Sequence, residues 1–213
     1  MFLHILLLIF LVNVMFPAKF YGKKVLAIFP CGSFLYDLNG EKSDKDYTVI
    51  LQSFKEVRVY KEEGVDYFLY GLEAFKKALH FDKSVLDYHL LWMDNTLIAK
   101  EHLLYIDESF VDEFNRIINV DWDRYLITWL RINVEYFTAC LDGLMNEKSL
   151  YNLYRVRSLM VNFEKTGIFT YYLSEGDRAL ILDYKNNRKN ISQHYENFKG
   201  ILKYLGTFLG REE

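Results

Sequence analysis

The sequence predicts an α+β fold in which a small mixed β-sheet with flanking helices precedes a C-terminal helical bundle. Two observations carry this prediction. Short runs of β-branched and aromatic residues, bounded by glycine and proline, fill residues 20–70, whereas the apolar spacing is helical from Asp121 onward. The chain has 213 residues, of which 51% are hydrophobic, so it is long enough for one large core or two smaller ones.

The predicted sheet begins with the run KKVLAIFPCGS. We expect this strand to end at Gly32, because its apolar residues are followed by proline and glycine. DYTVIL, residues 46–51, is a second strand by its β-branched residues. EVRVY and VDYFLY, residues 56–60 and 65–70, are expected to form a hairpin across KEEG, since Gly64 suits a tight turn.

Helical spacing replaces the strand pattern after the hairpin. LEAFKKALHF predicts one helix, and a long helix follows from Asp121. The apolar side of this long helix comprises Leu126, Trp129, Leu130, Phe137, Leu141 and Leu144. Three more helices are expected over EKSLYNLYRVRSLMVNFEKTG, which stops at Gly167, over EGDRALILDYK, and over QHYENFKGILKYLGTFL.

The change of pattern near residues 110–120 predicts a mixed α/β domain over 17–115 and a helical domain over 116–213. Residues 1–16, MFLHILLLIFLVNVMF, are apolar, short for a membrane span, and lack the basic start of a secretory signal. Three interpretations stay open for them: a dispensable leader with Met15 as the working start, a membrane anchor, or a packed first helix.

Composition favours a reducing compartment and argues against a grip on long duplex nucleic acid. Lys and Arg total 26 against 29 Asp and Glu, a net charge of −3, so a basic excess is lacking. Cys31 and Cys140 match no zinc spacing and give little support for a disulfide framework. If the first segment inserts in a membrane, Lys19, Lys23 and Lys24 after it leave the rest of the chain in the cytoplasm. We therefore expect a cytoplasmic protein whose membrane contact runs only through that first segment.

The end of the first strand offers a binding corner for phosphate. Gly32 and Ser33 present backbone N–H groups and a hydroxyl, and the missing Cβ of glycine lets an anion approach the chain. Asp44 and Asp46 straddle the start of the second strand, where residues i and i+2 point to the same face. Two neighbouring carboxylates repel each other unless a cation lies between them, and Mg²⁺ is the hard cation that also bridges phosphates.

Asp66 is the third acid of this predicted site, because its strand alternates and is expected to lie beside the strand of Asp44 and Asp46. Three carboxylates can hold two Mg²⁺ ions, with Mn²⁺ as a substitute. Such a pair aligns the α-phosphate of a nucleotide with an attacking hydroxyl, whose proton Asp66 can accept.

Structural roles are expected for several neighbouring residues. Asp82 and Asp87 are alternatives to Asp66, but helix capping or solvation suits them better. Cys31 at the strand end is expected to be a small buried hydrophobe. No P-loop motif or paired histidine spacing for zinc occurs. An exposed helix end is expected for the basic group of Lys185, Arg188 and Lys189.

The order Gly-Ser, a ten-residue spacer, Asp-x-Asp and a later acid-bearing strand resembles the signature of the DNA polymerase beta-like nucleotidyltransferase superfamily. The runs GSFLYDLNGEKSDKDYTVI, GVDYFLYGLEAFKKAL and EKSLYNLYRVRSLMVNFEKTG are similar to small stand-alone bacterial and phage nucleotidyltransferases, some linked to RNA repair. The resemblance covers most of residues 20–205. It implies that Gly32 and Ser33 bind the triphosphate, that Asp44 and Asp46 bind metal, and that Asp66 binds the catalytic metal or acts as base.

The resemblance also bears on the helical half. Lys148, Asn152 and Arg155 lie at i, i+4 and i+7, on one helix face opposite apolar residues. One interpretation is a solvated face; the other, implied by the family, is contact with the triphosphate or an acceptor phosphate. The chain departs from the family at Asp37, where relatives often have glycine after the tyrosine of the loop.

Together these residues predict a metal-dependent nucleotidyltransferase. It would transfer a nucleoside monophosphate from an NTP such as ATP to an acceptor hydroxyl and release pyrophosphate. An RNA 3′ end is the favoured acceptor, with a small molecule or a protein hydroxyl as alternatives. Two hypotheses compete with it. One is a non-catalytic nucleotide-binding or interaction module, and the other is an adaptor that is tethered to a membrane through residues 1–16 and uses the helical half as a partner surface.

Overall fold

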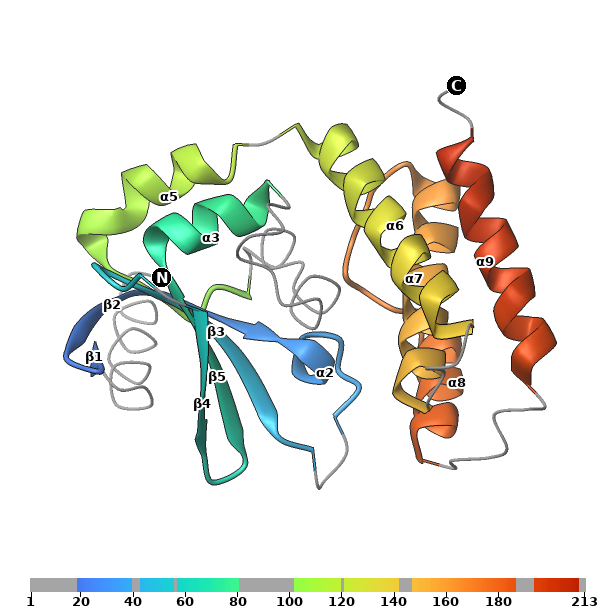
Figure 1. The fold of residues 1–213 in the computed structure, drawn as a ribbon, viewed down its shortest axis with the longest axis horizontal. Coiled ribbons are helices and arrows are strands. Elements are labelled where there is room, and N and C mark those ends of the chain that lie inside the picture. The colour runs from blue at the N-terminus through green and yellow to red at the C-terminus, as the bar shows by residue number, and fades with distance from the viewer. Residues whose placement is uncertain are drawn as a thin grey trace, which may run out of the picture. The chain divides into compact units, whose positions relative to one another are not determined.

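A computed structural model describes residues 19–39, 43–55, 57–80, 102–119, 121–141, 147–186 and 194–210 (Figure 1). The chain forms two compact units. The sheet unit comprises Met1–Leu35 and Asn39–Val120, and the helical unit comprises Tyr36–Leu38 and Asp121–Glu213. The mixed α+β fold class predicted from the sequence is confirmed.

The described part of the sheet unit contains six strands, in the order β1-β2-β3-β5-β4, with β6 paired to β2. The pair β3 and β5 is parallel, whereas the other pairs are antiparallel. The strands are β1 (Lys19–Phe20), β2 (Lys23–Cys31), β3 (Lys45–Leu51), β4 (Val57–Glu62), β5 (Val65–Gly71) and β6 (Tyr105–Ile106). All four predicted strands are present.

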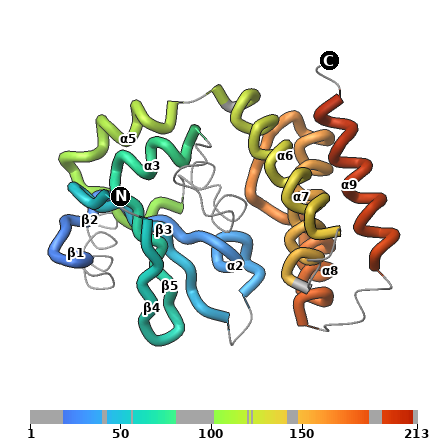
Figure 2. Tube along the Cα trace, in the orientation of Figure 1, coloured from blue at the N-terminus to red at the C-terminus, as the bar shows by residue number. Residues whose placement is uncertain are grey.

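The β4–β5 hairpin is the connection that makes the parallel pairing possible (Figure 2). A strand that returns parallel to its predecessor needs a crossover, and here β4 runs out along the far side of β5. Glu62 pairs with Val65, so the turn is only Glu63 and Gly64, and Gly64 has a φ of 69°. The turn was expected to include all four residues of KEEG, but it includes only the last two, and Lys61 belongs to β4.

Helices α3 (Leu72–Leu79) and α5 (Val111–Ile117) lie side by side over one face of the sheet (Figure 1). The ring centroids of Phe29 and Phe114 are 5.6 Å apart, and Lys76 joins the two helices through an ion pair to Glu113 at 2.9 Å. The short helices α2 (Gly32–Leu35) and η2 (Glu108–Phe110) complete the described part of the unit.

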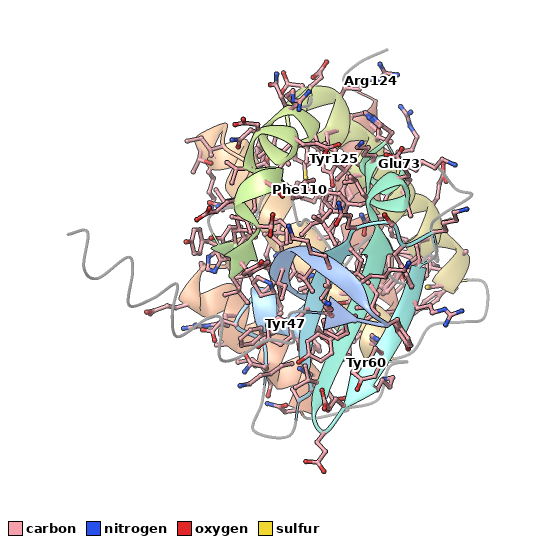
Figure 3. All side chains as sticks on the ribbon, turned by 90° about the vertical axis from the view of Figure 1, so that its left-hand side faces the viewer. Tyr47, Tyr60, Glu73, Phe110, Arg124 and Tyr125 are labelled. Atoms are coloured by element: carbon pink, nitrogen blue, oxygen red, sulfur yellow. The ribbon has the colours of Figure 1, made fainter. Side chains whose placement is uncertain are left out.

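The opposite face of the sheet carries a buried apolar cluster of Phe20, Val25, Ile28, Tyr47, Val49, Leu51, Tyr67 and Leu69. Tyr47 and Tyr67, which are register partners, stack with centroids 5.8 Å apart, and Tyr60 packs against Tyr67. Figure 3 labels Tyr47 and Tyr60 on the strands and Phe110 beside α5. Burial raises the pKa of the Tyr47 and Tyr67 hydroxyls, so both stay neutral at physiological pH.

Four helices form the helical unit: α6 (Trp122–Ala139), α7 (Glu147–Thr166), α8 (Glu175–Asn186) and α9 (Tyr195–Leu209). Their starts and stops follow from local chemistry. The Asp121 carboxylate accepts a hydrogen bond from the Arg124 backbone N–H at the start of α6, and Gly167, with a φ of 68°, ends α7. At the start of α8, Ser174 Oγ accepts from the Asp177 N–H.

The helical core is apolar and largely as predicted. Trp129, Leu130 and Phe137 of α6 are buried, and Phe137 meets Phe198 of α9 with ring centroids 6.1 Å apart. Leu141, which was also predicted for this apolar side, is half-buried. Leu144 lies outside the described residues. None of the described helices has both the length and the apolar character to cross a bilayer. Residues 1–16, the predicted leader or anchor, fall outside the described part of the chain.

Gly71, at the junction of β5 and α3, gives the first testable prediction. A Cβ at this position would lie 2.5 Å from the carbonyl carbon of Phe54 and nearer still to its oxygen, so the backbone must shift. We expect Gly71→Ala to lower the free energy of unfolding by about 3 kcal/mol. Gly200→Ala is the matched control, because that Cβ meets no atom within 4 Å in the middle of α9. It should raise stability by about 0.5–1 kcal/mol. Urea unfolding of both variants measures the contrast, and equal midpoints would contradict it.

Candidate active site

Strand β2 delivers Gly32 to a sharp bend where the chain turns into α2. Gly32 has a φ of 57°, which a side chain rarely adopts. A Cβ there would lie 3.0 Å from Cγ of Asp46 and closer to its Oδ2. The Asp46 carboxylate therefore rests against the Gly32 backbone, and this contact explains why the position requires glycine.

The sheet brings Asp46 and Asp66 together. Residue 46 of β3 is the register partner of residue 66 of the parallel strand β5, and neighbouring strands lie about 4.8 Å apart. Asp46 and Asp66 are half-buried. Asp44 is exposed and immediately precedes β3, which begins at Lys45. We call Asp44, Asp46 and Asp66 the acidic corner.

Lys61 of β4 is a cation at this corner that the sequence reasoning missed. Its Nζ lies 2.5 Å from Asp66 Oδ2, and the two residues are register partners. The hydrogen bond to Asp66 raises the pKa of Lys61, with further contributions from the charges of Asp66, Asp44 and Asp46. The signal was available in the hairpin: once Gly64 fixes a two-residue turn, the residue paired with Asp66 is Lys61.

The corner was also assessed as a metal site. Across the described ranges, no three side chains of Asp, Glu, His or Cys are close enough together to hold a metal ion. Two features nevertheless fit a hard cation. The donors are carboxylates, and the ammonium of Lys61 already binds one of them.

Ser33 lies in the first turn of α2 and is half-buried. Cys31, one residue before Gly32, is fully buried, as predicted for a small hydrophobe. Cys140 is also buried, and its Sγ lies 3.6 Å from Ser149 Oγ. Asp82 and Asp87, the alternative third acids, lie outside the described residues.

In the helical unit, the prediction of a solvated face on α7 is wrong for two of its three residues. Lys148 is exposed, but Asn152 and Arg155 are each only 1% exposed. They belong to a polar seam of α7 with a three-residue spacing, formed by Ser149, Asn152, Arg155 and Ser158, all buried. The burial of these four side chains shows that the seam faces packed protein and not solvent.

Residues 36–38 explain how charge is accommodated inside this unit. The guanidinium carbon of Arg155 lies 4.3 Å from the centre of the Tyr36 ring, a cation–π contact. Asp37 forms an ion pair with Arg178 of α8 and holds a φ of 54°, a conformation that suits the glycine expected there from the family. Lys185 donates to the Leu38 carbonyl at 2.7 Å and is half-buried. The prediction of an exposed end is therefore wrong for Lys185.

Asn152 stands apart within the seam. Neither its Nδ2 nor its Oδ1 has a hydrogen-bond partner among the described residues, although both are fully buried. An unsatisfied buried amide costs about 1–3 kcal/mol. A polar ligand that reached this amide would remove that cost.

No protein-family model matches the chain, and no curated protein matches it in a sequence search. The resemblance to nucleotidyltransferases therefore rests on the motif residues of the sequence.

The close approach of Asp46 to Gly32 generates a second prediction. Gly32→Ala places a side chain both in a left-handed backbone and against a carboxylate, so we expect a loss of about 2–3 kcal/mol in the free energy of unfolding. Gly22→Ala is the control, because Gly22 has a φ of 72° with no atom within 4 Å of the added Cβ. It should cost only about 1 kcal/mol. Chemical denaturation measures both, and equal losses would mean that Asp46 exerts no constraint.

Proposed function

We propose that this protein is a metal-dependent nucleotidyltransferase that transfers a nucleoside monophosphate from an NTP to an acceptor hydroxyl. The observation that carries the proposal is the position of Asp46, against the Gly32 backbone at the end of β2 and in register with Asp66 of β5. Motif residues widely separated in sequence are thereby joined at one edge of the sheet.

Each residue of the corner has a role in this proposal. Gly32 and Ser33 bind the triphosphate through backbone N–H groups and a hydroxyl. Asp44, Asp46 and Asp66 supply hard oxygen ligands for Mg²⁺, which would neutralise the phosphate charge when bound. The acceptor oxygen forms a bond to the α-phosphorus while the bond to the β-phosphate oxygen breaks. The acceptor proton passes to Asp66, and pyrophosphate leaves.

An RNA 3′ end remains our favoured acceptor. The net charge of −3 argues against a long duplex grip but permits a short, local contact with single-stranded RNA. The buried Asn152 and Arg155 are proposed to give polar contacts to the substrate in the helical unit, and the exposed Lys148 to bind phosphate. A cytoplasmic location goes with this proposal.

A second candidate is a non-catalytic nucleotide-binding module. The ion pair between Lys61 and Asp66 favours it, because a carboxylate bound to an ammonium is not free to ligate metal or accept a proton. The two candidates differ in whether bound NTP is turned over.

Transfer of label from [α-³²P]NTPs to short RNAs, with Mg²⁺ and each base in turn, tests the proposal. We expect labelling by the native chain and a loss of about 100-fold or more in Asp46→Asn, because a neutral amide binds the cation poorly. Asp107→Asn is the matched control, because the half-buried Asp107 forms an ion pair with Lys24 at 2.8 Å, at the opposite end of β2 from the acidic corner. It should keep full transfer activity. Absence of labelling with NTP binding intact would support the non-catalytic module instead.

Asn152→Leu tests the role of the seam. Leucine shares the branching of asparagine at Cγ and has no unsatisfied amide, but it is larger, so the gain from removing the amide is opposed by overpacking and thermal stability should change by no more than about 1–2 kcal/mol. NTP affinity should fall about 3- to 10-fold if the amide binds substrate. Asn162→Leu is the control on the same helix, because Asn162 already donates to Thr170 Oγ1 at 3.4 Å. Fluorescent-nucleotide binding measures the affinities. Unchanged affinity in Asn152→Leu would remove the residue from the site.

A further inference from the structure

Lys61 makes an ion pair of a particular kind. Its side chain is 69% exposed, whereas that of its partner Asp66 is 15% exposed, so the lysine reaches inward from solvent to a carboxylate that is largely shielded. A flexible four-carbon stem on the last described strand of the sheet can also carry the ammonium away again.

The position of the ammonium matters more than the single bond. The ammonium donates a hydrogen bond to Asp66, and the negative charges of Asp44 and Asp46 act on it as well. All members of the acidic corner thus act on one cationic group supplied by the chain. The ammonium occupies the position beside Asp66 that a divalent cation bound to this carboxylate would take.

Lys24 provides a comparison within the same sheet. Its ammonium lies 2.8 Å from Asp107 Oδ2 and reaches Ser109 Oγ at 3.4 Å. The side chain of Asp107 is 16% exposed, so this acid is as shielded as Asp66, but it belongs to no predicted site. The two lysines therefore have the same charge and a similar bond, but only Lys61 is paired with the acidic corner.

We propose that Lys61 is a built-in counter-cation of the acidic corner, which neutralises Asp66 in the metal-free protein and is displaced when a divalent cation binds. This inference rests on the proposed function. A divalent cation is attracted to closely spaced carboxylates more strongly than the singly charged ammonium of Lys61, so it can displace the ammonium from Asp66. The exchange also releases Asp66 from the ammonium, so that its carboxylate can bind metal or accept a proton.

The test is a titration of the full chain with Mn²⁺ in the absence of nucleotide. The EPR signal of free Mn²⁺ measures how much of the ion is bound. Lys61→Met keeps the aliphatic stem and removes the competing charge. We expect it to bind Mn²⁺ about two- to fivefold more tightly than the native chain, the range that corresponds to an exposed ion pair. Lys24→Met, which changes the net charge equally, should bind as the native chain does. Circular dichroism confirms that both variants are folded.

The outcomes separate this inference from the proposed function. Mn²⁺ binding that is lost in Asp46→Asn but equal or weaker in Lys61→Met would overturn the counter-cation and leave the metal site standing. No Mn²⁺ binding in the native chain or in Lys61→Met would overturn both. Tighter binding in Lys61→Met without any nucleotidyl transfer by the native chain would support the exchange and count against the enzyme.

Discussion

The parallel pairing of β3 and β5 is the constraint on which the candidate site depends. It sets Asp46 beside Asp66, and because the chain must cross over to make a parallel pair, it also requires β4. The two-residue turn at Gly64 then fixes which residue of β4 pairs with Asp66. Two acids and one lysine thus acquire their positions from backbone hydrogen bonding. A slip of one residue in either pairing would send alternate side chains to the other face and separate them.

The other physical constraint is the treatment of buried polar groups in the helical unit. Burying a guanidinium is costly unless its charge is compensated. Arg155 lies against the face of the Tyr36 ring, and the neighbouring residues of that segment bind Arg178 and Lys185. The segment of residues 36–38 therefore has cationic neighbours from two helices, α7 and α8. Asn152, one turn from Arg155, receives no such compensation from the described residues.

Much of the sheet could be predicted from the sequence, because the composition of its strands and the alternation of their side chains are visible in the local sequence. The strand of Asp66 was expected beside that of Asp46, and the structure pairs them. The helices α5 and η2 and the strand β6 were not anticipated. They are short, so local periodicity is weak, and tertiary packing decides them: Phe114 contacts Phe29, and β6 adds two residues to β2.

The candidate site shows the same division. Glycine followed by spaced acids is a local pattern, and a local pattern can be recognised in the sequence without the structure. The burial of Arg155 depends on Tyr36, more than a hundred residues earlier, and the polarity of the helix face indicated solvent instead. Lys185 was misjudged for the same reason, since its acceptor is the Leu38 carbonyl. Long-range partners of polar side chains cannot be read from helical spacing alone.

Lys61 also has a purely structural explanation, and its geometry distinguishes the two. Terminal strands of sheets commonly carry exposed charges that discourage pairing with other chains, and β4 ends the described sheet path with Arg58, Lys61 and Glu62 exposed. A charge that serves only that purpose does not require an acidic partner. Arg58 shows the alternative, since its guanidinium lies 5.8 Å from the ring centre of the exposed Tyr21. The ammonium of Lys61 instead joins Asp66, the acid that the parallel register sets beside Asp46. Protection of the strand explains why a charge is present on β4, whereas repulsion within the acidic corner explains where that charge is directed.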